Sequence, residues 1–187
     1  MYNMREIEIK IKVKNLKAVE QRLLAKGAKI SEPIEQRDVI YSSKEMVERF
    51  EVSKEGDLIT RIRRLKNKTI LTLKQQRSNE MDNLEYETEI SDPEAMHQIL
   101  LALGQKPVVK VSKQRRTCKL ADYEICLDEV EGLGTFVEFE KLTSEDANPD
   151  QVRAELFQTA ESLGLSRADE ETHGYDTQLY LKNQSST

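Results

Sequence analysis

Apolar and charged residues alternate strictly at the start of the chain. From Arg5 to Lys14, isoleucine and valine occupy every second position and charged residues occupy the positions between them. Successive side chains of a β-strand point to opposite faces of a sheet. This pattern therefore predicts a strand with one apolar face and one fully charged face, which carries Glu6, Glu8 and Lys10.

The same two-residue period predicts further strands along the chain. They are expected at about residues 36–42, 48–52, 58–65, 68–75, 84–90, 107–120, 122–130 and 134–142. The strand at 84–90 repeats the first pattern, with Glu85, Glu87 and Glu89 on one side. The polar stretch from Gln76 to Asn83 is expected to be a mobile loop.

Helical spacing of apolar residues predicts three helices between these strands. They begin after Asn15, at Asp92-Pro93 and at Asn148-Pro149, where Asn and Asp are good N-caps and Pro fits the first turn. Gly27, Gly104 and Gly164 are expected to end them.

The order of charged strand, helix and basic strands occurs twice. No linker separates the two occurrences, so the chain is predicted to be one domain, residues 1–182, built of two related halves. Tyr175, Leu179 and Tyr180 are expected to fold back onto this domain, and residues 183–187 are expected to form a disordered tail.

Composition and charge exclude several classes of protein. The 187 residues are 37% hydrophobic, enough for one sizeable core. A net charge of -5 and an aromatic content of 5% argue against a nucleic-acid-binding protein. No apolar run approaches the roughly 20 residues of a membrane helix, so a cytoplasmic protein without a membrane partner is expected. Cys118 and Cys126 lack metal-ligand spacing and are expected to be reduced, without a disulfide or thiol chemistry.

The charged strand faces are sorted by sign. Basic positions two residues apart are Arg61 and Arg63, and Lys113 and Arg115, whereas other strands carry mostly Glu. Two interpretations stay open at this point: faces that simply meet water, or a closed sheet with a polar lumen. In such a lumen, Arg and Lys would bind phosphates and carboxylates would hold a hard divalent cation.

Several motifs, taken in order, favour the lumen. Glu6-Ile-Glu8-Ile-Lys10 resembles the ExExK signature of the CYTH superfamily, the triphosphate tunnel metalloenzymes that include class IV adenylyl cyclases and thiamine triphosphatases. The stretch from Leu127 to Glu140 resembles the LDxVxGLGxFVExE motif of the same family. With the basic strand segments between them, the resemblance covers roughly residues 5 to 180.

The resemblance implies an α+β fold, in which a closed eight-stranded antiparallel β-barrel forms a tunnel and the helices pack outside it. It implies metal ligands for Mg²⁺ or Mn²⁺ at Glu6, Glu8, Glu138 and Glu140. It implies phosphate-binding side chains at Lys10, Arg61, Arg63, Lys74, Lys113 and Arg115. Glu6, Glu8 and Lys10 would be catalytic, and Glu87 and Asp128 would be further tunnel carboxylates.

Three activities remain open for such a site. The chain length, the segment from Gln36 to Tyr41 and the GLGTFVEFE run resemble class IV adenylyl cyclases, which convert ATP to cyclic AMP and pyrophosphate. The first alternative is a triphosphatase acting on thiamine triphosphate, tripolyphosphate or nucleoside triphosphates. The second is a polyphosphate- or nucleotide-binding module without turnover. An exposed barrel edge would also permit a homodimer.

Overall fold

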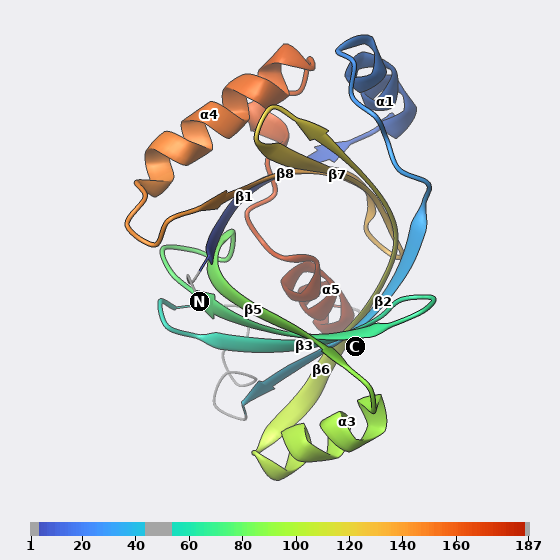
Figure 1. The fold of residues 1–187 in the computed structure, drawn as a ribbon, viewed down its shortest axis with the longest axis vertical. Helices are drawn as coiled ribbons and strands as arrows, with labels where there is room; N and C mark the ends of the chain where they lie inside the picture. The colour runs from blue at the N-terminus through green and yellow to red at the C-terminus, as the bar shows by residue number, and fades with distance from the viewer. Residues whose placement is uncertain (1–3, 44–53, 186–187) are drawn as a thin grey trace.

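The computed structural model describes residues 4–43 and 54–185. In these residues eight antiparallel strands close into a ring in the order β1-β5-β4-β3-β2-β6-β7-β8 (Figure 1). Their bounds are β1 (Met4–Val13), β2 (Ile34–Ser43), β3 (Leu58–Arg64), β4 (Thr69–Gln76), β5 (Asp82–Ile90), β6 (Gln105–Leu120), β7 (Tyr123–Val130) and β8 (Gly134–Thr143). The predicted closed antiparallel barrel is confirmed, and the strand predicted at 48–52 lies outside the described residues.

The order of strands also confirms two related halves. One half runs β1, α1 (Leu16–Ala25), β2, β3, β4, and the other runs β5, α3 (Pro93–Ala102), β6, β7, β8. In this correspondence β1 matches β5, β2 matches β6, β3 matches β7 and β4 matches β8. When each strand is exchanged for its match, every strand keeps the same neighbours around the ring.

The helices begin where the sequence predicts, because side chains cap their free N–H groups. Asn15 accepts a hydrogen bond from the backbone N–H of Ala18 at 3.1 Å. Asp92 caps α3 in the same way, and Asn148 caps α4 (Pro149–Ser162). No helix in the described ranges has both the length and the apolar character required to span a membrane.

The main hydrophobic core lies outside the barrel, between the sheet and α1 and α4. In Figure 1 these two helices lie beside β1, β7 and β8, and α3 lies at the opposite side of the ring. Ile7 and Ile9 of β1 are fully buried in this core with Leu23 of α1 and Leu156 of α4. Burial of the apolar strand faces against these helices leaves the charged faces turned inward.

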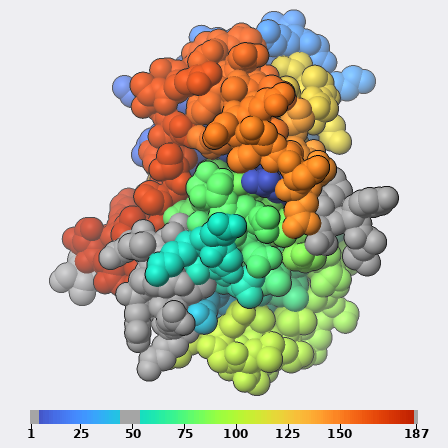
Figure 2. Space-filling view, turned by 90° about the vertical axis from the view of Figure 1, so that its left-hand side faces the viewer, coloured from blue at the N-terminus to red at the C-terminus, as the bar shows by residue number. Residues whose placement is uncertain are grey.

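The barrel has a seam between β1 and β5. Their register extends only from Met4 to Ile7 of β1 among the described residues. In Figure 2 the blue start of β1 is visible between the orange α4 region and the green segments. Farther along β1, the C-terminal segment takes the place of β5, since the backbone N–H of Glu171 donates to the carbonyl of Lys10 at 2.8 Å.

The last helix, α5 (Tyr175–Gln184), packs inside one end of the barrel, where it lies within the ring in Figure 1. Tyr175 and Leu179 join an apolar cluster with the inward-facing Phe136, so the predicted return of this segment to the body is confirmed. The helix includes Asn183 and Gln184. The prediction of a disordered tail from residue 183 is therefore wrong at that boundary, and residues 186–187 are not described.

The segment predicted to be a mobile loop is in large part ordered structure. Gln76 ends β4, and Asp82 already belongs to β5. Asp82 is fully buried and accepts from Nε and Nη2 of Arg5, each at 2.6 Å, and from the hydroxyl of Ser78 at 2.5 Å. Asp82 is therefore held by hydrogen bonds to Ser78 within this segment and to Arg5 of β1. The polarity of the segment alone could not reveal these bonds.

Candidate functional site

The barrel encloses a cavity of about 340 Å³. In the described part of the chain six basic side chains line it: Lys10, Arg61, Arg63, Lys74, Lys113 and Arg115. These are the six predicted phosphate-binding residues. Eleven carboxylates also line it: Glu6, Glu8, Asp38, Asp57, Glu80, Glu85, Glu87, Glu124, Glu138, Glu140 and Asp176. The charged strand faces thus form a lumen instead of a water-facing outer surface.

One wall of the cavity is organised by a buried carboxylate. Asp128 accepts from Nε and Nη2 of Arg115 at 2.8 and 2.6 Å, from Nζ of Lys113 at 3.2 Å and from the hydroxyl of Tyr175 at 3.0 Å. Burial opposes its charge, but Lys113 and Arg115 outweigh burial and hold the pKa of Asp128 below its usual range. Asp128 has no exposed surface and does not border the cavity. Asp128 thus faces the interior of the barrel, as predicted for a tunnel carboxylate, and supports the basic side chains that line the cavity.

A second part of the wall carries the two arginines of β3. Arg63 donates to both carboxylate oxygens of Asp38, at 2.9 and 2.7 Å. Arg61 donates to Thr72 at 3.1 Å and lies 3.3 Å from Glu87, which accepts from the Thr72 hydroxyl at 2.7 Å. Nε of Arg61 is buried and has no partner among the described residues. Arg61 therefore retains a hydrogen-bond donor for an anion in the cavity.

Three carboxylates converge on one point of the tunnel. Glu8, Glu138 and Glu140 each place one oxygen within 4.8 Å of the others. Such a set of oxygen ligands suits a hard divalent cation. Nζ of Lys10 lies 3.3 Å from Glu138, and Arg115 also pairs with Glu138. The group therefore adjoins the basic residues directly.

The three carboxylates do not share the same protonation behaviour. Burial, with the charges of Glu138 and Glu8, raises the pKa of Glu140 to about 7, even though Arg115 opposes this shift. Burial and the charge of Glu138 raise the pKa of Glu8. For Glu138, burial acts in the same sense, but Arg115 and Lys10 hold its pKa well below the usual range. A divalent cation would relieve the repulsion that raises the pKa values of Glu140 and Glu8.

Glu6 lies with another set of residues. Its carboxylate is 3.7 Å from Nζ of Lys74, which also forms an ion pair with Glu85. Burial and the charges of Glu85 and Glu140 raise the pKa of Glu6 well above its usual range. Among the described residues the compact three-carboxylate group does not include Glu6. The predicted set of four metal ligands is thus divided between two places in the cavity.

Some residues of the site were not singled out in the sequence. Asp38 and Gln36 line the cavity from β2, and their two-residue spacing was the available signal. Oε1 of Gln36 is buried without a hydrogen-bond partner in the described ranges. The ring of Tyr175 lies 4.3 Å from Nζ of Lys10 and 4.8 Å from Nζ of Lys113. The return of Tyr175 to the body was expected from the sequence, but its contacts with these two lysines depend on where α5 enters the barrel.

Comparisons with known proteins agree with the tunnel fold. The CYTH domain family model matches residues 4–175. The chain is 32% identical over 164 residues to a Methanocaldococcus jannaschii protein named "Putative adenylate cyclase MJ0240", a match that covers 87% of this chain and 91% of that protein. It is 33% identical over 88 residues to "Adenylate cyclase CyaB" of Aeromonas hydrophila, covering 47% of this chain and 46% of that protein. A solved structure of a conserved hypothetical protein from Pyrococcus furiosus aligns with a TM-score of 0.76 and 29% identity, over 91% of this chain and 98% of that chain.

Proposed function

This chain belongs to the CYTH domain family, and on that premise we propose that it is a metal-dependent enzyme that converts ATP to cyclic AMP and pyrophosphate inside its tunnel. The observation that carries the proposal is the position of Arg115. Its guanidinium contacts Asp128 in the basic wall and also Glu138 and Glu140 in the three-carboxylate group. A phosphate chain and a divalent cation would therefore lie side by side.

The balance of charge supports a requirement for metal. The carboxylates that line the cavity outnumber its basic side chains, so a triphosphate by itself would be repelled. Glu8, Glu138 and Glu140 are the residues that would hold Mg²⁺ or Mn²⁺. When bound, such an ion neutralises charge on the phosphates and activates the attacking oxygen.

The residues of the chain supply positioning and charge stabilisation. Arg61, Arg63 and Arg115 can each bind phosphate oxygens through two donors, and the lysines add point charges. Held in this way, the leaving pyrophosphate is stabilised while the ribose 3′-oxygen attacks the α-phosphorus. Glu6 is our candidate for the group that takes the proton of the 3′-hydroxyl. Burial and the charge of Glu85 raise its pKa, which makes the ionised carboxylate a stronger base.

The names of two relatives support the cyclase over other reactions of such a site. The Methanocaldococcus jannaschii protein is named "Putative adenylate cyclase" and the Aeromonas hydrophila protein "Adenylate cyclase". The first of these matches most of both chains.

Hydrolysis of a triphosphate is the second candidate. Of the described residues that line the cavity, Tyr175 is the one aromatic side chain, and it is already covered by Lys10 and Lys113. The cavity therefore offers many groups for phosphates and few for a base. This arrangement would also accept tripolyphosphate or thiamine triphosphate, with water attacking the terminal phosphorus.

Product analysis tests the proposal. The purified protein is incubated with ATP, thiamine triphosphate or tripolyphosphate, each with Mg²⁺ or Mn²⁺. Cyclic AMP and pyrophosphate from ATP are the expected products. Orthophosphate would favour the triphosphatase, and a lack of turnover with every substrate would leave only a binding module. Glu138→Gln should abolish turnover, and a variant as active as the wild type would contradict the site.

The proposal extends to a cytoplasmic location and to a homodimer. Cytoplasmic protein would have access to ATP. The homodimer would join two copies of the barrel through one self-complementary surface. Light scattering on the purified protein would give the mass in solution, and a monomer at all concentrations would exclude the dimer.

A further inference from the structure

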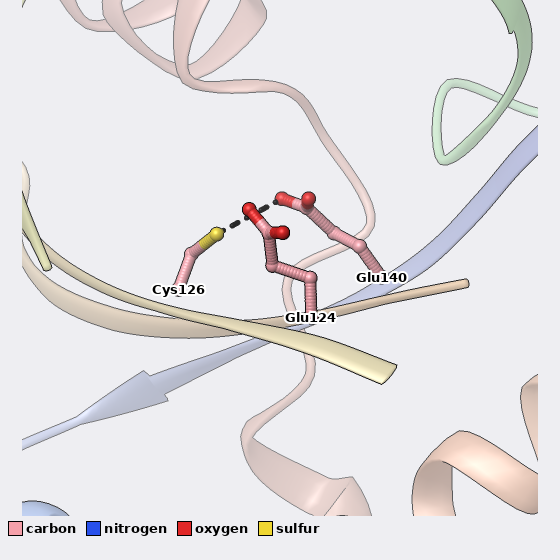
Figure 3. Close-up of side chains that lie close together, drawn as sticks. All are labelled: Glu124, Cys126 and Glu140. Carbon is pink, nitrogen blue, oxygen red and sulfur yellow. Dashed lines mark hydrogen bonds between the residues drawn. The ribbon is translucent and has the colours of Figure 1, made fainter. Parts of the chain in front are cut away.

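Cys126 faces the tunnel, unlike the second cysteine of the chain. Its neighbour Ile125 packs in the outer core, so strand alternation turns Glu124 and Cys126 of β7 inward. The sulfur of Cys126 donates a hydrogen bond to Oε1 of Glu140 at 3.3 Å (Figure 3). Cys118, in contrast, is part of the outer core. The two cysteines therefore have different environments although both are buried.

Glu124 and Glu140 lie directly opposite each other across the β7–β8 ladder. Like charges at opposed positions of a sheet repel each other. Glu140 has Arg115 at 3.4 Å. Lys119 stands opposite Glu124 on the other side of β7, but no ion pair within 4.0 Å joins these two side chains in the described residues. A cation between the two carboxylates would remove this repulsion.

The three side chains together have the chemistry of a soft-metal site. One ligand atom each of Glu124, Cys126 and Glu140 lies within 4.8 Å of the other two. Figure 3 shows the three side chains converging from neighbouring strands. A thiolate favours zinc-like ions, whereas the all-oxygen group of Glu8, Glu138 and Glu140 favours harder ions.

We propose that Glu124, Cys126 and Glu140 form a second cation site, which binds a thiophilic divalent ion such as Zn²⁺. The ion takes the Cys126 sulfur as thiolate, whose proton leaves to solvent, together with one oxygen of each glutamate. Three protein ligands leave a fourth position for water.

Glu140 belongs to both groups of ligands. An ion at the second site would therefore take Glu140 from the Glu8–Glu138–Glu140 group and inhibit turnover. The binding itself is independent of the proposed function, and only the inhibition rests on it.

Cadmium binding tests the site without any enzyme assay. Metal-free protein is titrated with Cd²⁺, and the ultraviolet absorption of the cadmium–thiolate bond is followed. Wild type and Cys118→Ser, the matched control, should bind one equivalent. Cys126→Ser should lose the absorption. Glu124→Gln should weaken Cd²⁺ binding by at least roughly tenfold. Loss of a residue that only hydrogen-bonds a metal ligand already has an effect of that size.

Competition and a second variant complete the test. Excess Zn²⁺ should remove the cadmium signal, and excess Mg²⁺ should leave it. Glu124 is only partly buried, so Glu124→Gln tests the site even if Cys126→Ser, at a fully buried position, folds poorly. Full absorption in Cys126→Ser, unchanged affinity in Glu124→Gln, or equal displacement by Mg²⁺ would overturn the proposal.

Turnover separates the site from the proposed function. Zn²⁺ should inhibit wild type and Cys118→Ser alike, and more of it should be needed for Glu124→Gln. Cadmium binding by a protein without turnover would support the site while contradicting the enzyme. If Zn²⁺ fills the site and turnover is unaffected, then Glu140 is not shared between the two groups of ligands.

Discussion

Arg115 and Asp128 stand opposite each other on β6 and β7 and are joined by two hydrogen bonds, Nε to Oδ1 at 2.8 Å and Nη2 to Oδ2 at 2.6 Å. The same carboxylate accepts from Lys113 and from Tyr175 at the start of α5. One fully buried side chain therefore positions two cavity cations and ties the last helix to the barrel.

Asp128→Asn should destabilise the protein by about 3–5 kcal/mol, because removal of one member of a buried ion pair leaves uncompensated charge. Urea unfolding measures the change. The matched control is Asp122→Asn in the neighbouring turn, where Asp122 is largely exposed and lies 3.4 Å from Lys141. That variant should change stability by less than about 1 kcal/mol. Equal losses in both variants would contradict the assigned role of Asp128.

Arg63→Ala should weaken the binding of a triphosphate with Mg²⁺ by about 1.5–3 kcal/mol, the range for hydrogen bonds to charged groups. Isothermal titration measures the affinity. Arg37→Ala is the control, since Arg37 is exposed and pairs with Glu35 on the outside of β2. Because Arg63→Ala also leaves Asp38 unpaired, the double variant with Asp38→Asn isolates the arginine. Unchanged affinity in the single and the double variant would exclude the tunnel as the triphosphate site.

Without metal, the protein should lose stability as the pH rises from about 5 to 7. Burial and neighbouring carboxylates raise the pKa of Glu140 from 4.5 to about 7, so the folded state holds a proton that the unfolded chain has released. This contribution is complete below the unfolded pKa and is lost as the pH rises through the folded one. The loss is on the order of 1–3 kcal/mol.

Urea unfolding at several pH values in a chelating buffer measures this slope. Glu140→Gln should flatten it. Glu8 and Glu6, whose pKa values are also raised by burial, should leave a residual slope of the same sign. Stability that increases over this range would contradict the raised pKa values.

Mg²⁺ should stabilise the protein more at about pH 8 than at about pH 6, because the ion and the proton compete for Glu140. Thermal unfolding with and without Mg²⁺ measures the shift. Glu138→Gln should reduce the shift at both pH values, and Glu145→Gln, a half-exposed glutamate outside the cavity, should preserve it. A shift independent of pH in the wild type would argue against Glu140 as a ligand.

Gln36→Met should raise stability by about 1 kcal/mol, because it removes a buried amide oxygen that lacks a partner in the described residues. The same change should raise the KM for the triphosphate if this amide contacts substrate. Gln114→Met, an exposed position on β6, is the control for both measurements. Lower stability of Gln36→Met would show that the amide is satisfied in solution.

The sequence by itself determined the local features of this protein. Alternation in β1 identified the face that carries Glu6, Glu8 and Lys10, because side-chain direction follows from the two-residue period. Asn15 and Asp92 marked helix starts, because capping requires only neighbouring residues. All six predicted phosphate-binding side chains line the cavity, since a strand face that is charged in sequence stays together once the sheet closes.

Only the tertiary structure decided which of these residues meet. Glu6 lies with Lys74 and not in the compact group of Glu8, and Asp128 is fully buried by its contacts with Lys113, Arg115 and Tyr175. Tyr175 enters the lumen from α5, and Cys126 meets Glu140 across two strands. Strand neighbours and register are set by closure of the whole barrel and by packing against its helices. Contacts between residues distant in the chain leave no local pattern from which they could be predicted.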